Sequence, residues 1–222
     1  MSKVGTSKTE ARKPGAKKPV PRRTALANQV RIIGGQWKRT PLPVLAAEGL
    51  RPTPDRVRET VFNWLTHLRD GDWKNVVCLD LFAGTGALGF EAASRGAQKV
   101  ILVESSSAAV AQMEANKEKL QANQVSIMRG DALTIVQRLG SASHFDLIFL
   151  DPPYHQDWLA KLLPACVPLL APSAVVYVEA EASLLDSDAP EWVADWHVIR
   201  ADRAGSVFYH LLQRKSAPTF EA

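Results

Sequence analysis

Residues 76–95 read VVCLDLFAGTGALGFEAASR, and this stretch establishes the fold class. Its apolar start, Val76–Leu81, has the length and residue types of a buried strand, and a helix is predicted over Gly86–Arg95. Between them, Gly84 and Gly86 let the backbone bend sharply and approach a ligand closely where the helix begins. A strand, a glycine-rich turn and a helix in this order are typical of the first unit of an open α/β sheet.

Strands and helices continue to alternate after this unit. Further strands are predicted at Val100–Val103, Val125–Met128, Phe145–Leu150 and Ala174–Val178, separated by helices at Ser107–Ala122, Leu133–Leu139 and Trp158–Leu170. The chain then ends in two strands, Trp196–Arg200 and Val207–Leu212, joined by the turn Asp202–Ser206. Alternation predicts a parallel sheet with helices on both faces, and the closing hairpin adds one antiparallel strand. We therefore expect a Rossmann-like α/β fold with a seven-stranded, mostly parallel sheet.

An N-terminal extension precedes the sheet. A β-hairpin is predicted within Gln29–Val44, with strands at Val30–Ile33 and Trp37–Arg39 around a Gly34-Gly35 turn. A helix is predicted over Pro54–Arg69, with Thr53 as its N-cap. Its apolar face consists of Val57, Val61, Trp64, Leu65 and Leu68. Its basic side, with Arg56 and Arg58, is expected to face a ligand or phosphates.

Positive charge is concentrated in the N-terminal tail. The net charge of the chain is +4, yet residues 1–23 carry eight Lys or Arg against one acid, and the remainder carries 19 basic and 22 acidic residues. A tail of Lys, Arg and Pro cannot bury a core, so residues 1–28 are predicted to be disordered. Such a tail either attracts phosphates without sequence preference or only keeps the protein in solution. The predicted organisation is this basic tail, the extension (29–74), the sheet domain (75–215) and a C-terminal tail (216–222).

Composition excludes several kinds of site and location. Hydrophobic residues make up 46% and charged residues 23%, which matches an ordinary globular protein. Cys78 and Cys166 lie in apolar stretches without metal-ligand spacing, so no metal site is expected. The N-terminus lacks the apolar segment of a signal peptide, and the uncharged run Leu162–Val178 is interrupted by prolines. We expect a cytoplasmic monomer that does not bind membranes.

Acidic residues follow two of the other predicted strands. Glu104 ends the second strand, about twenty residues after the glycine turn, where an acid suits the two hydroxyls of a ribose. Asp131, beside Ala132, follows the third strand and can accept a hydrogen bond from an adenine amine. Each has a simpler interpretation, because an acid at such a place also caps a helix. The glycines also spell GxGxxG, so a nicotinamide dinucleotide site stays open.

The most informative motif, Asp151-Pro152-Pro153-Tyr154, follows the fourth predicted strand. Its two prolines stiffen the loop and leave carbonyl groups available to accept hydrogen bonds. Asp151 and the Pro152 carbonyl are then two acceptors for one amino group, and Tyr154 offers a stacking surface for the ring that carries it. Two such acceptors can draw the lone pair of an aromatic amine out of conjugation and aim it at an electrophilic methyl group.

These motifs resemble those of the class I, S-adenosylmethionine-dependent amino-methyltransferases with a DPPY motif. More narrowly, the chain resembles the bacterial family that methylates the N2 amine of a guanine, guanine 966, in 16S ribosomal RNA. The resemblance covers about residues 30–214. Its most specific pieces are Arg31–Gly35, Arg51–Thr53, Arg56–Glu59, Asp80–Phe90, Asp151–Tyr154 and Gly205–Val207.

The resemblance implies a role for each motif. The cofactor S-adenosylmethionine, converted to S-adenosylhomocysteine, would be bound by Asp80, Phe82, Gly84, Thr85, Gly86, Glu104, Asp131 and Ala132. The catalytic residues would be Asp151, Pro152 and Tyr154. The partner, 16S rRNA in the small ribosomal subunit, would be bound by Arg31, Lys38, Arg39, Arg51, Arg56, Arg58 and Pro153. No metal is implied.

Four other functions stay open. A dehydrogenase would explain the glycines and Glu104 but gives the DPPY motif no role. A DNA adenine-N6 or cytosine-N4 amino-methyltransferase shares the DPPY chemistry. Protein glutamine methyltransferases usually have Asn in place of Asp151. A non-catalytic RNA-binding module is the fourth alternative.

Overall fold

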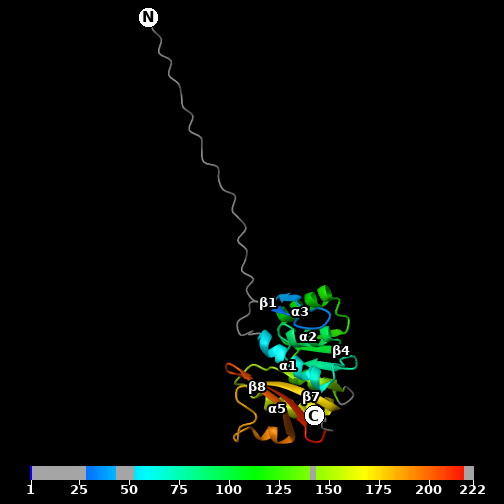
Figure 1. Cartoon of the computed structure of the whole chain (residues 1–222), viewed down its shortest axis with the longest axis vertical. Coiled ribbons are helices and arrows are strands. Elements are labelled where there is room, and N and C mark those ends of the chain that lie inside the picture. The colour runs from blue at the N-terminus through cyan, green and yellow to red at the C-terminus, as the bar shows by residue number, and fades with distance from the viewer. Residues whose placement is uncertain (2–28, 44–52, 141–143, 218–222) are drawn as a thin grey trace.

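A computed structural model of the chain describes residue 1 and residues 29–43, 53–140 and 144–217. Nearly all of the predicted disordered tail, the predicted RNA-binding residue Arg51 and most of the predicted C-terminal tail lie outside the described residues. Figure 1 shows the described part as a sheet with helices packed against it.

Seven strands form one sheet in the order β5-β4-β3-β6-β7-β9-β8. They are β3 (Val77–Asp80), β4 (Lys99–Glu104), β5 (Val125–Arg129), β6 (Phe145–Leu150), β7 (Leu170–Ala180), β8 (Trp196–Ala204) and β9 (Val207–Arg214). Neighbours from β5 to β7 are parallel, while β9 runs antiparallel to both β7 and β8. The predicted Rossmann-like sheet with one antiparallel strand is therefore confirmed. The strand order reverses beside β3, and ligands of open α/β sheets bind at such a point.

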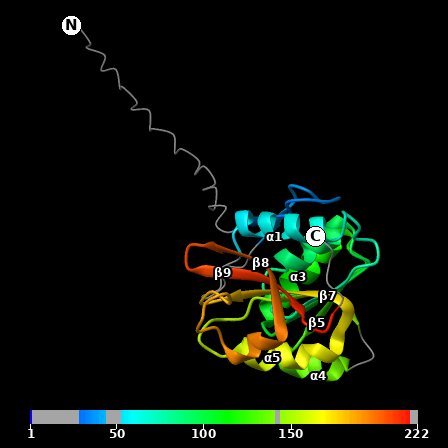
Figure 2. The ribbon, with the colours of Figure 1, turned by 60° about the horizontal axis from the view of Figure 1, so that its bottom comes forward.

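Helices cover both faces of this sheet. On one face lie α1 (Asp55–Leu68), α2 (Ala87–Arg95) and α3 (Ser107–Leu120), and on the other lie α4 (Ala132–Leu139) and α5 (Trp158–Cys166). Two short 3-10 helices, η1 (Val167–Leu169) and η2 (Glu191–Asp195), lie in the connections around β7. Figure 2 shows α1 and α3 above the sheet and α4 and α5 below it. No helix in the described ranges is long and apolar enough to cross a membrane.

Each face of the sheet has its own hydrophobic core. Phe149 of β6 points to the first core, where its ring centroid lies 5.8 Å from those of Phe62 in α1 and Tyr177 in β7. Its neighbours Ile148 and Leu150 point to the second core, as the two-residue period of a strand requires. Because α1 is part of the first core, the N-terminal extension packs in the same unit as the strands that form the site.

The N-terminal hairpin differs from the prediction in its second strand. β1 (Gln29–Arg31) pairs with β2 (Pro41–Pro43) and not with residues 37–39. The glycine pair does not make a two-residue turn, because it contacts α2 instead. A Cβ on Gly35, whose φ is +74°, would lie 1.9 Å from the backbone oxygen of Ser94. The glycines are thus required for the close approach of this loop to α2.

Helix α1 has nearly its predicted extent but a different N-terminus. Pro54 occupies the N-cap position, and the hydroxyl of the predicted cap, Thr53, points instead to two carboxyl groups described below. Arg58, expected on the outer side, is completely buried. Its guanidinium donates to Asp55 at 2.6 Å and to the Arg31 carbonyl at 2.8 Å. Arg58 thus ties α1 to β1 from the interior, and its side chain does not reach the surface on which the RNA contact was predicted.

Candidate active site

A cleft of about 790 Å³ opens where the central strands end. Its walls come from the segments that follow β3, β4, β5 and β6 and from the turn between β8 and β9. Ten of the predicted site residues line it, namely Phe82, Gly84, Thr85, Glu104, Asp131, Ala132, Asp151, Pro152, Pro153 and Tyr154. They meet in one cavity because the carboxyl ends of parallel strands lie at the same edge of a sheet.

The glycine turn after β3 is tied to the end of β4. Gly84 has a φ of +52°, and its N–H donates to Glu104 Oε2 at 2.9 Å. The other oxygen, Glu104 Oε1, accepts from the Ser106 N–H at 2.8 Å. These backbone donors fix the carboxylate at the cleft wall. Oε1 also accepts from the Ser105 hydroxyl at 3.3 Å, whereas Oε2 keeps a lone pair for a further donor, such as the hydroxyl of a sugar.

Asp131 is both the N-cap of α4 and a residue of the cleft. Its Oδ1 accepts from the N–H and the hydroxyl of Thr134, at 2.9 and 3.1 Å. The simpler interpretation, a helix cap, is therefore present in the structure. Both bonds use Oδ1, so capping leaves Oδ2 able to accept from a ligand.

Two predicted cofactor residues lie behind the cleft wall. Gly86 (φ +77°) precedes α2, and a Cβ there would lie 2.6 Å from the Phe90 ring. Asp80 is 1% exposed, and within the described residues neither carboxyl oxygen has a hydrogen bond of normal geometry. Burial raises the pKa of Asp80 to about 7, although the nearby N–H groups of Phe82 and Gly89 lower it. Above about pH 7, where it is mostly ionised, Asp80 can act on the cleft through its charge.

The Asp151–Tyr154 loop leaves β6 and is held in place from the end of β7. Glu181 accepts a hydrogen bond from the His155 N–H at 2.5 Å and lies 2.7 Å from His155 Nδ1. His155 has a left-handed φ of +62°, a conformation that costs a non-glycine residue about 1 kcal/mol or more. The contact with Glu181 keeps the loop in this shape, directly beside the half-buried Tyr154.

A buried acid that the sequence patterns did not single out, Glu179, lies beside Asp151. Glu179 is 4% exposed and lines the cleft. Its Oε1 accepts from the hydroxyls of Tyr177 and Thr53, at 2.8 and 3.0 Å. The Thr53 hydroxyl also lies 3.3 Å from Asp151 Oδ2. An acid just after a predicted strand is the signal that identified Glu104, and it could have identified Glu179.

Burial acts on both carboxyl groups, and repulsion by neighbouring acids acts on Asp151. Burial raises the pKa of Asp151 well above its usual range, and the charges of Glu179 and Asp80 raise it further. Burial also raises the pKa of Glu179, against the hydrogen bonds from Tyr177 and Thr53 that lower it. In the described part of the chain, no lysine or arginine contributes to either pKa.

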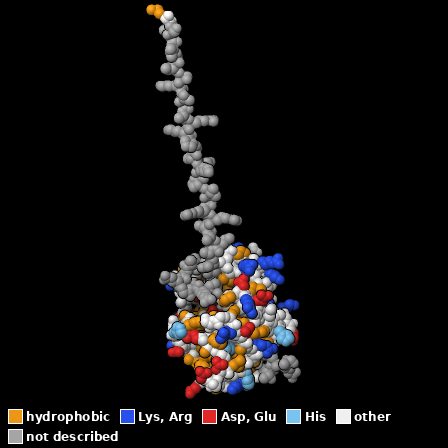
Figure 3. Space-filling view, turned by 60° about the vertical axis from the view of Figure 1, so that its left-hand side comes forward, with side chains coloured by type: hydrophobic (Ala, Val, Ile, Leu, Met, Phe, Trp, Pro, Cys, Tyr) orange, Lys and Arg blue, Asp and Glu red, His pale blue; other side chains and the backbone are white. Residues whose placement is uncertain are grey.

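The predicted RNA-binding residues of the extension that the structure describes lie outside the cleft. Lys38, Arg39 and Arg56 are exposed, and Arg31, with 68% of its side chain exposed, pairs with Asp55 at 3.1 Å. Figure 3 shows lysine and arginine side chains at the upper right of the visible face and acidic ones toward its lower left edge. On this face, basic side chains are thus denser at the upper right.

The cleft has the donors and acceptors that a nucleoside cofactor and an amine substrate need. Glu104 and Asp131 present oxygens at the ends of neighbouring strands, and the Gly84 turn brings backbone close to the same space. Asp151 and Pro152 present acceptors from the next strand along. Across the described ranges, no group of three or more His, Cys, Asp or Glu side chains is arranged to hold a metal ion.

Comparison with known proteins gives close relatives over most of the chain. Residues 30–213 match the model of the family described as Conserved hypothetical protein 95. Ribosomal RNA small subunit methyltransferase D of Escherichia coli (strain K12) is 38% identical over 192 residues, which cover 86% of this chain and 92% of that protein. The protein of the same name from Haemophilus influenzae is 38% identical over 191 residues, covering 83% and 94%.

Solved structures share the fold. The Escherichia coli protein yhhF, which carries a methyltransferase assignment, matches with a TM-score of 0.71 and 38% identity, covering 85% of this chain and 99% of that one. A Haemophilus influenzae protein assigned as a methylase matches with a TM-score of 0.66 and 33% identity, covering 84% and 99%.

Proposed function

This chain belongs to the family of the ribosomal RNA small subunit methyltransferases D, and on this basis we propose that it methylates RNA of the small ribosomal subunit with S-adenosylmethionine. The proposed acceptor is the N2 amine of a single guanine, guanine 966, in 16S rRNA. The enzyme would meet this RNA in an assembling or assembled subunit.

One observation carries the proposal: a single cleft holds Glu104, Asp131 and the Asp151–Tyr154 loop. The first two come from strands on one side of β3, and the loop follows β6 on its other side. The strand order reverses at β3, so a cofactor bound on one side of β3 and a base bound on the other can meet within the same cleft.

The cofactor half of the cleft suits S-adenosylmethionine. Glu104 would accept from the ribose hydroxyls, Asp131 Oδ2 from the adenine amine, and the Gly84 turn would lie against the methionine part. Behind this turn the buried carboxyl of Asp80 adds negative charge when it is ionised, which favours a cation in front of it. The bound cofactor supplies a methyl group on a positively charged sulfur.

The base half of the cleft prepares the amine. Asp151 and the Pro152 carbonyl would accept the two N2 hydrogens, and Tyr154 would stack on the guanine ring. The guanine must leave its own stack, because an amine inside a duplex cannot approach the methyl group in line. Holding the amine by two acceptors contributes both orientation and electrostatic stabilisation as positive charge develops on nitrogen.

The N-terminal extension would bind the RNA around the target. Arg31, Lys38, Arg39 and Arg56 present exposed positive charge there, as contacts to phosphates require. The buried Arg58 would support this surface from within. Arg51 retains its proposed role, and its position lies outside the described residues.

The experiment that tests this function uses S-adenosylmethionine labelled on its methyl group, unmethylated small subunits, and parallel pools of DNA and protein. Digestion of the RNA and identification of the labelled nucleoside follow. We expect N2-methylguanosine at one site. Label found only in DNA or protein would overturn the RNA substrate while leaving methyl transfer in place.

A further inference from the structure

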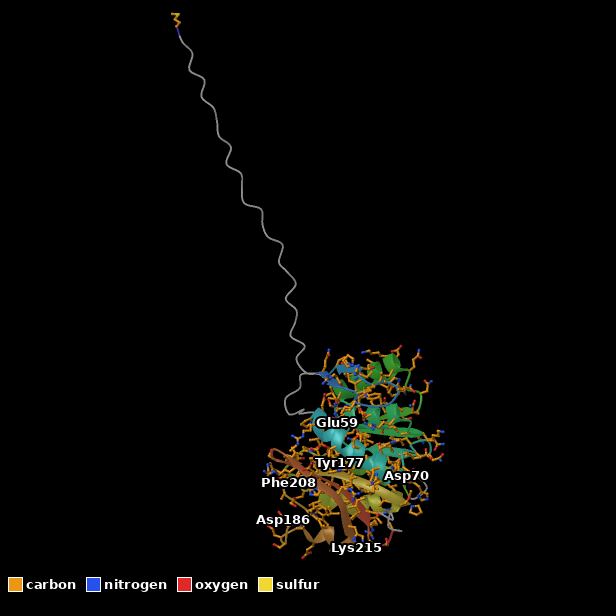
Figure 4. The ribbon with its side chains drawn as sticks, viewed as in Figure 1. Glu59, Asp70, Tyr177, Asp186, Phe208 and Lys215 are labelled. Atoms are coloured by element: carbon orange, nitrogen blue, oxygen red, sulfur yellow. The ribbon has the colours of Figure 1, made fainter. Side chains whose placement is uncertain are left out.

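The inner end of the cleft contains four linked side chains. We name Asp151 and Glu179 the carboxyl pair, and Thr53 and Tyr177 its hydroxyl donors. Tyr177, labelled in Figure 4, is completely buried in the first core, to which residues of α1 also belong. Glu179 and Thr53 are also buried, yet both line the cleft. Glu179 is therefore shielded from bulk water, while the half-buried Asp151 faces the cleft, where a substrate can reach it.

The hydrogen bonds of the carboxyl pair are unequal. Glu179 Oε1 accepts from Tyr177 at 2.8 Å and from Thr53 at 3.0 Å, whereas Asp151 Oδ2 has the Thr53 hydroxyl at a longer 3.3 Å. A hydroxyl has a single hydrogen, so Thr53 cannot fully serve both acids. Glu179 is thus the better stabilised anion. If Asp151 carries a proton, it can donate a hydrogen bond to Glu179. This bond completes the hydrogen bonding of the carboxyl pair.

The charges around the carboxyl pair favour such a proton. Asp80 at the end of β3 adds a negative charge that raises the pKa of Asp151. Tyr209 of β9 contributes to the raised pKa of Tyr177. From α1, Arg58 donates to the Thr53 carbonyl at 3.4 Å, and the carboxylates near its guanidinium are those of Asp55 and Glu91. No cation in the described ranges offsets two adjacent anions. Two buried carboxylates that share a site usually retain one proton between them.

We propose that Asp151 and Glu179 share one proton and together accept the proton that the methylated amine releases, so that Glu179 ends the step protonated. The idea rests on the proposed function, because it concerns the same amine. It gives Glu179 a positioning and proton-accepting role that acts through Asp151. Neither group has to reach solvent while the substrate fills the cleft.

The proton balance of the step is complete. The N2 lone pair forms a bond to the methyl carbon as the carbon–sulfur bond breaks, and that electron pair stays on sulfur. The nitrogen then carries one hydrogen too many and a positive charge. This proton passes to Asp151 while the proton that Asp151 already shares passes to Glu179. The carboxyl pair changes from one negative charge to none, and it loses the extra proton when the products leave.

Infrared spectroscopy tests the shared proton without RNA or cofactor. A protonated carboxyl has a C=O band distinct from that of a carboxylate, and at about pH 8.5 Asp80 is mostly ionised, so it adds little to this band. We expect the full-length protein to keep one protonated carboxyl, and both Glu179→Gln and Asp151→Asn to lose it. The exposed Glu118 in α3 provides the control Glu118→Gln, which should keep the band. A wild-type protein without the band would overturn the proposal.

Kinetics with small subunits test the proton transfer. We expect Glu179→Gln to lower kcat by about 10²-fold with KM near that of the wild type. Its remaining carboxyl, Asp151, loses a repulsive neighbour, so the acidic limb of the pH–rate profile should move to lower pH. Tyr177→Phe removes a donor from the Glu179 anion and should move that limb to higher pH.

Opposite shifts of the acidic limb are specific to a titrating pair. A merely structural Glu179 would leave the limb in place in both variants, which would overturn the proposal even if kcat fell. Failure of the proposed function looks different, because the wild type would then place no label in RNA while the infrared band persisted.

Discussion

At the residue scale, the acids of this site differ in their surroundings, and these set what each can do. Backbone N–H groups hold Glu104, a threonine holds Asp131, and hydroxyls hold Glu179. Asp80 has no such bond within the described residues. Their positions after strands could be predicted from the sequence. Their protonation could not, because it depends on burial and on partners such as Thr53, far away in the chain.

The pKa of Asp80 makes stability depend on pH. Its folded-state value, about 7, lies above the ordinary value of an unfolded chain, so the folded protein binds the proton more tightly. The resulting stability is complete below about pH 4 and is lost as pH rises through 7. At about pH 8 the ionised group costs about 4 kcal/mol.

Asp80→Asn should therefore raise the melting temperature more at about pH 8 than at about pH 5, where the wild-type carboxyl is largely protonated. Thermal unfolding followed by circular dichroism at both pH values measures this. Asp188→Asn, at an exposed position, is the control and should change little at either pH. Equal stabilisation by Asp80→Asn at the two pH values would show that the group is ionised throughout.

At the element scale, the strands and helices of the sheet followed from hydrophobic patterning, while the hairpin did not. The alternation after Val76 has a strong local period, and each predicted element is present. The loop after β1 is shaped by residues some sixty positions later, since Glu91 accepts from the N–H groups of Ile33 and Gly34 at 2.6 and 2.8 Å. The local sequence around Gly34 and Gly35 does not reveal that these glycines are required for a contact with α2.

Glu91 should thus hold the N-terminal extension in position without contacting the cofactor. Its buried carboxyl also pairs with Arg95 at 2.8 Å and lies 4.0 Å from Arg58. Glu91→Gln takes the carboxylate partner from Arg95 and leaves Arg58 with Asp55 alone, and we expect it to destabilise the protein by about 3 kcal/mol. It should also weaken RNA binding, because the loop with Lys38 and Arg39 loses its anchor.

Urea unfolding and binding titrations check both effects of Glu91→Gln. S-adenosylhomocysteine affinity, measured on the folded variant, serves as the internal control and should stay near the wild-type value. Weakened cofactor binding together with unchanged RNA binding would contradict the role given to the extension.

At the scale of the whole molecule, charge is divided between the tail and the rest. Residues 1–23 carry the net positive charge, whereas the remainder has slightly more acids than bases. If the tail contacts phosphates, deleting residues 1–23 should weaken RNA binding and reduce its salt dependence. Each lost phosphate contact should lower the slope of log affinity against log salt by about 0.7 to 0.9. Binding isotherms at several salt concentrations measure the slope, and an unchanged slope would exclude the tail from the interface.

The sheet as a whole separates cofactor binding from chemistry, because Glu104 and Asp151 follow strands on opposite sides of β3. This separation predicts two distinct defects. Glu104→Ala should weaken S-adenosylhomocysteine binding by about tenfold or more. A tenfold loss of affinity corresponds to roughly 1.4 kcal/mol, the free energy expected from the lost hydrogen bonds. Its methyl transfer at saturating cofactor should change less.

The most direct measurement is the single-turnover rate of methyl transfer to unmethylated small subunits by Asp151→Ala, with S-adenosylhomocysteine affinity measured on the same sample. We predict a rate lower by about 10²-fold or more and a cofactor affinity near that of the wild type, because the lost group holds the amine and not the cofactor. A rate close to that of the wild type would contradict the assignment of Asp151 and, with it, the proposed mechanism.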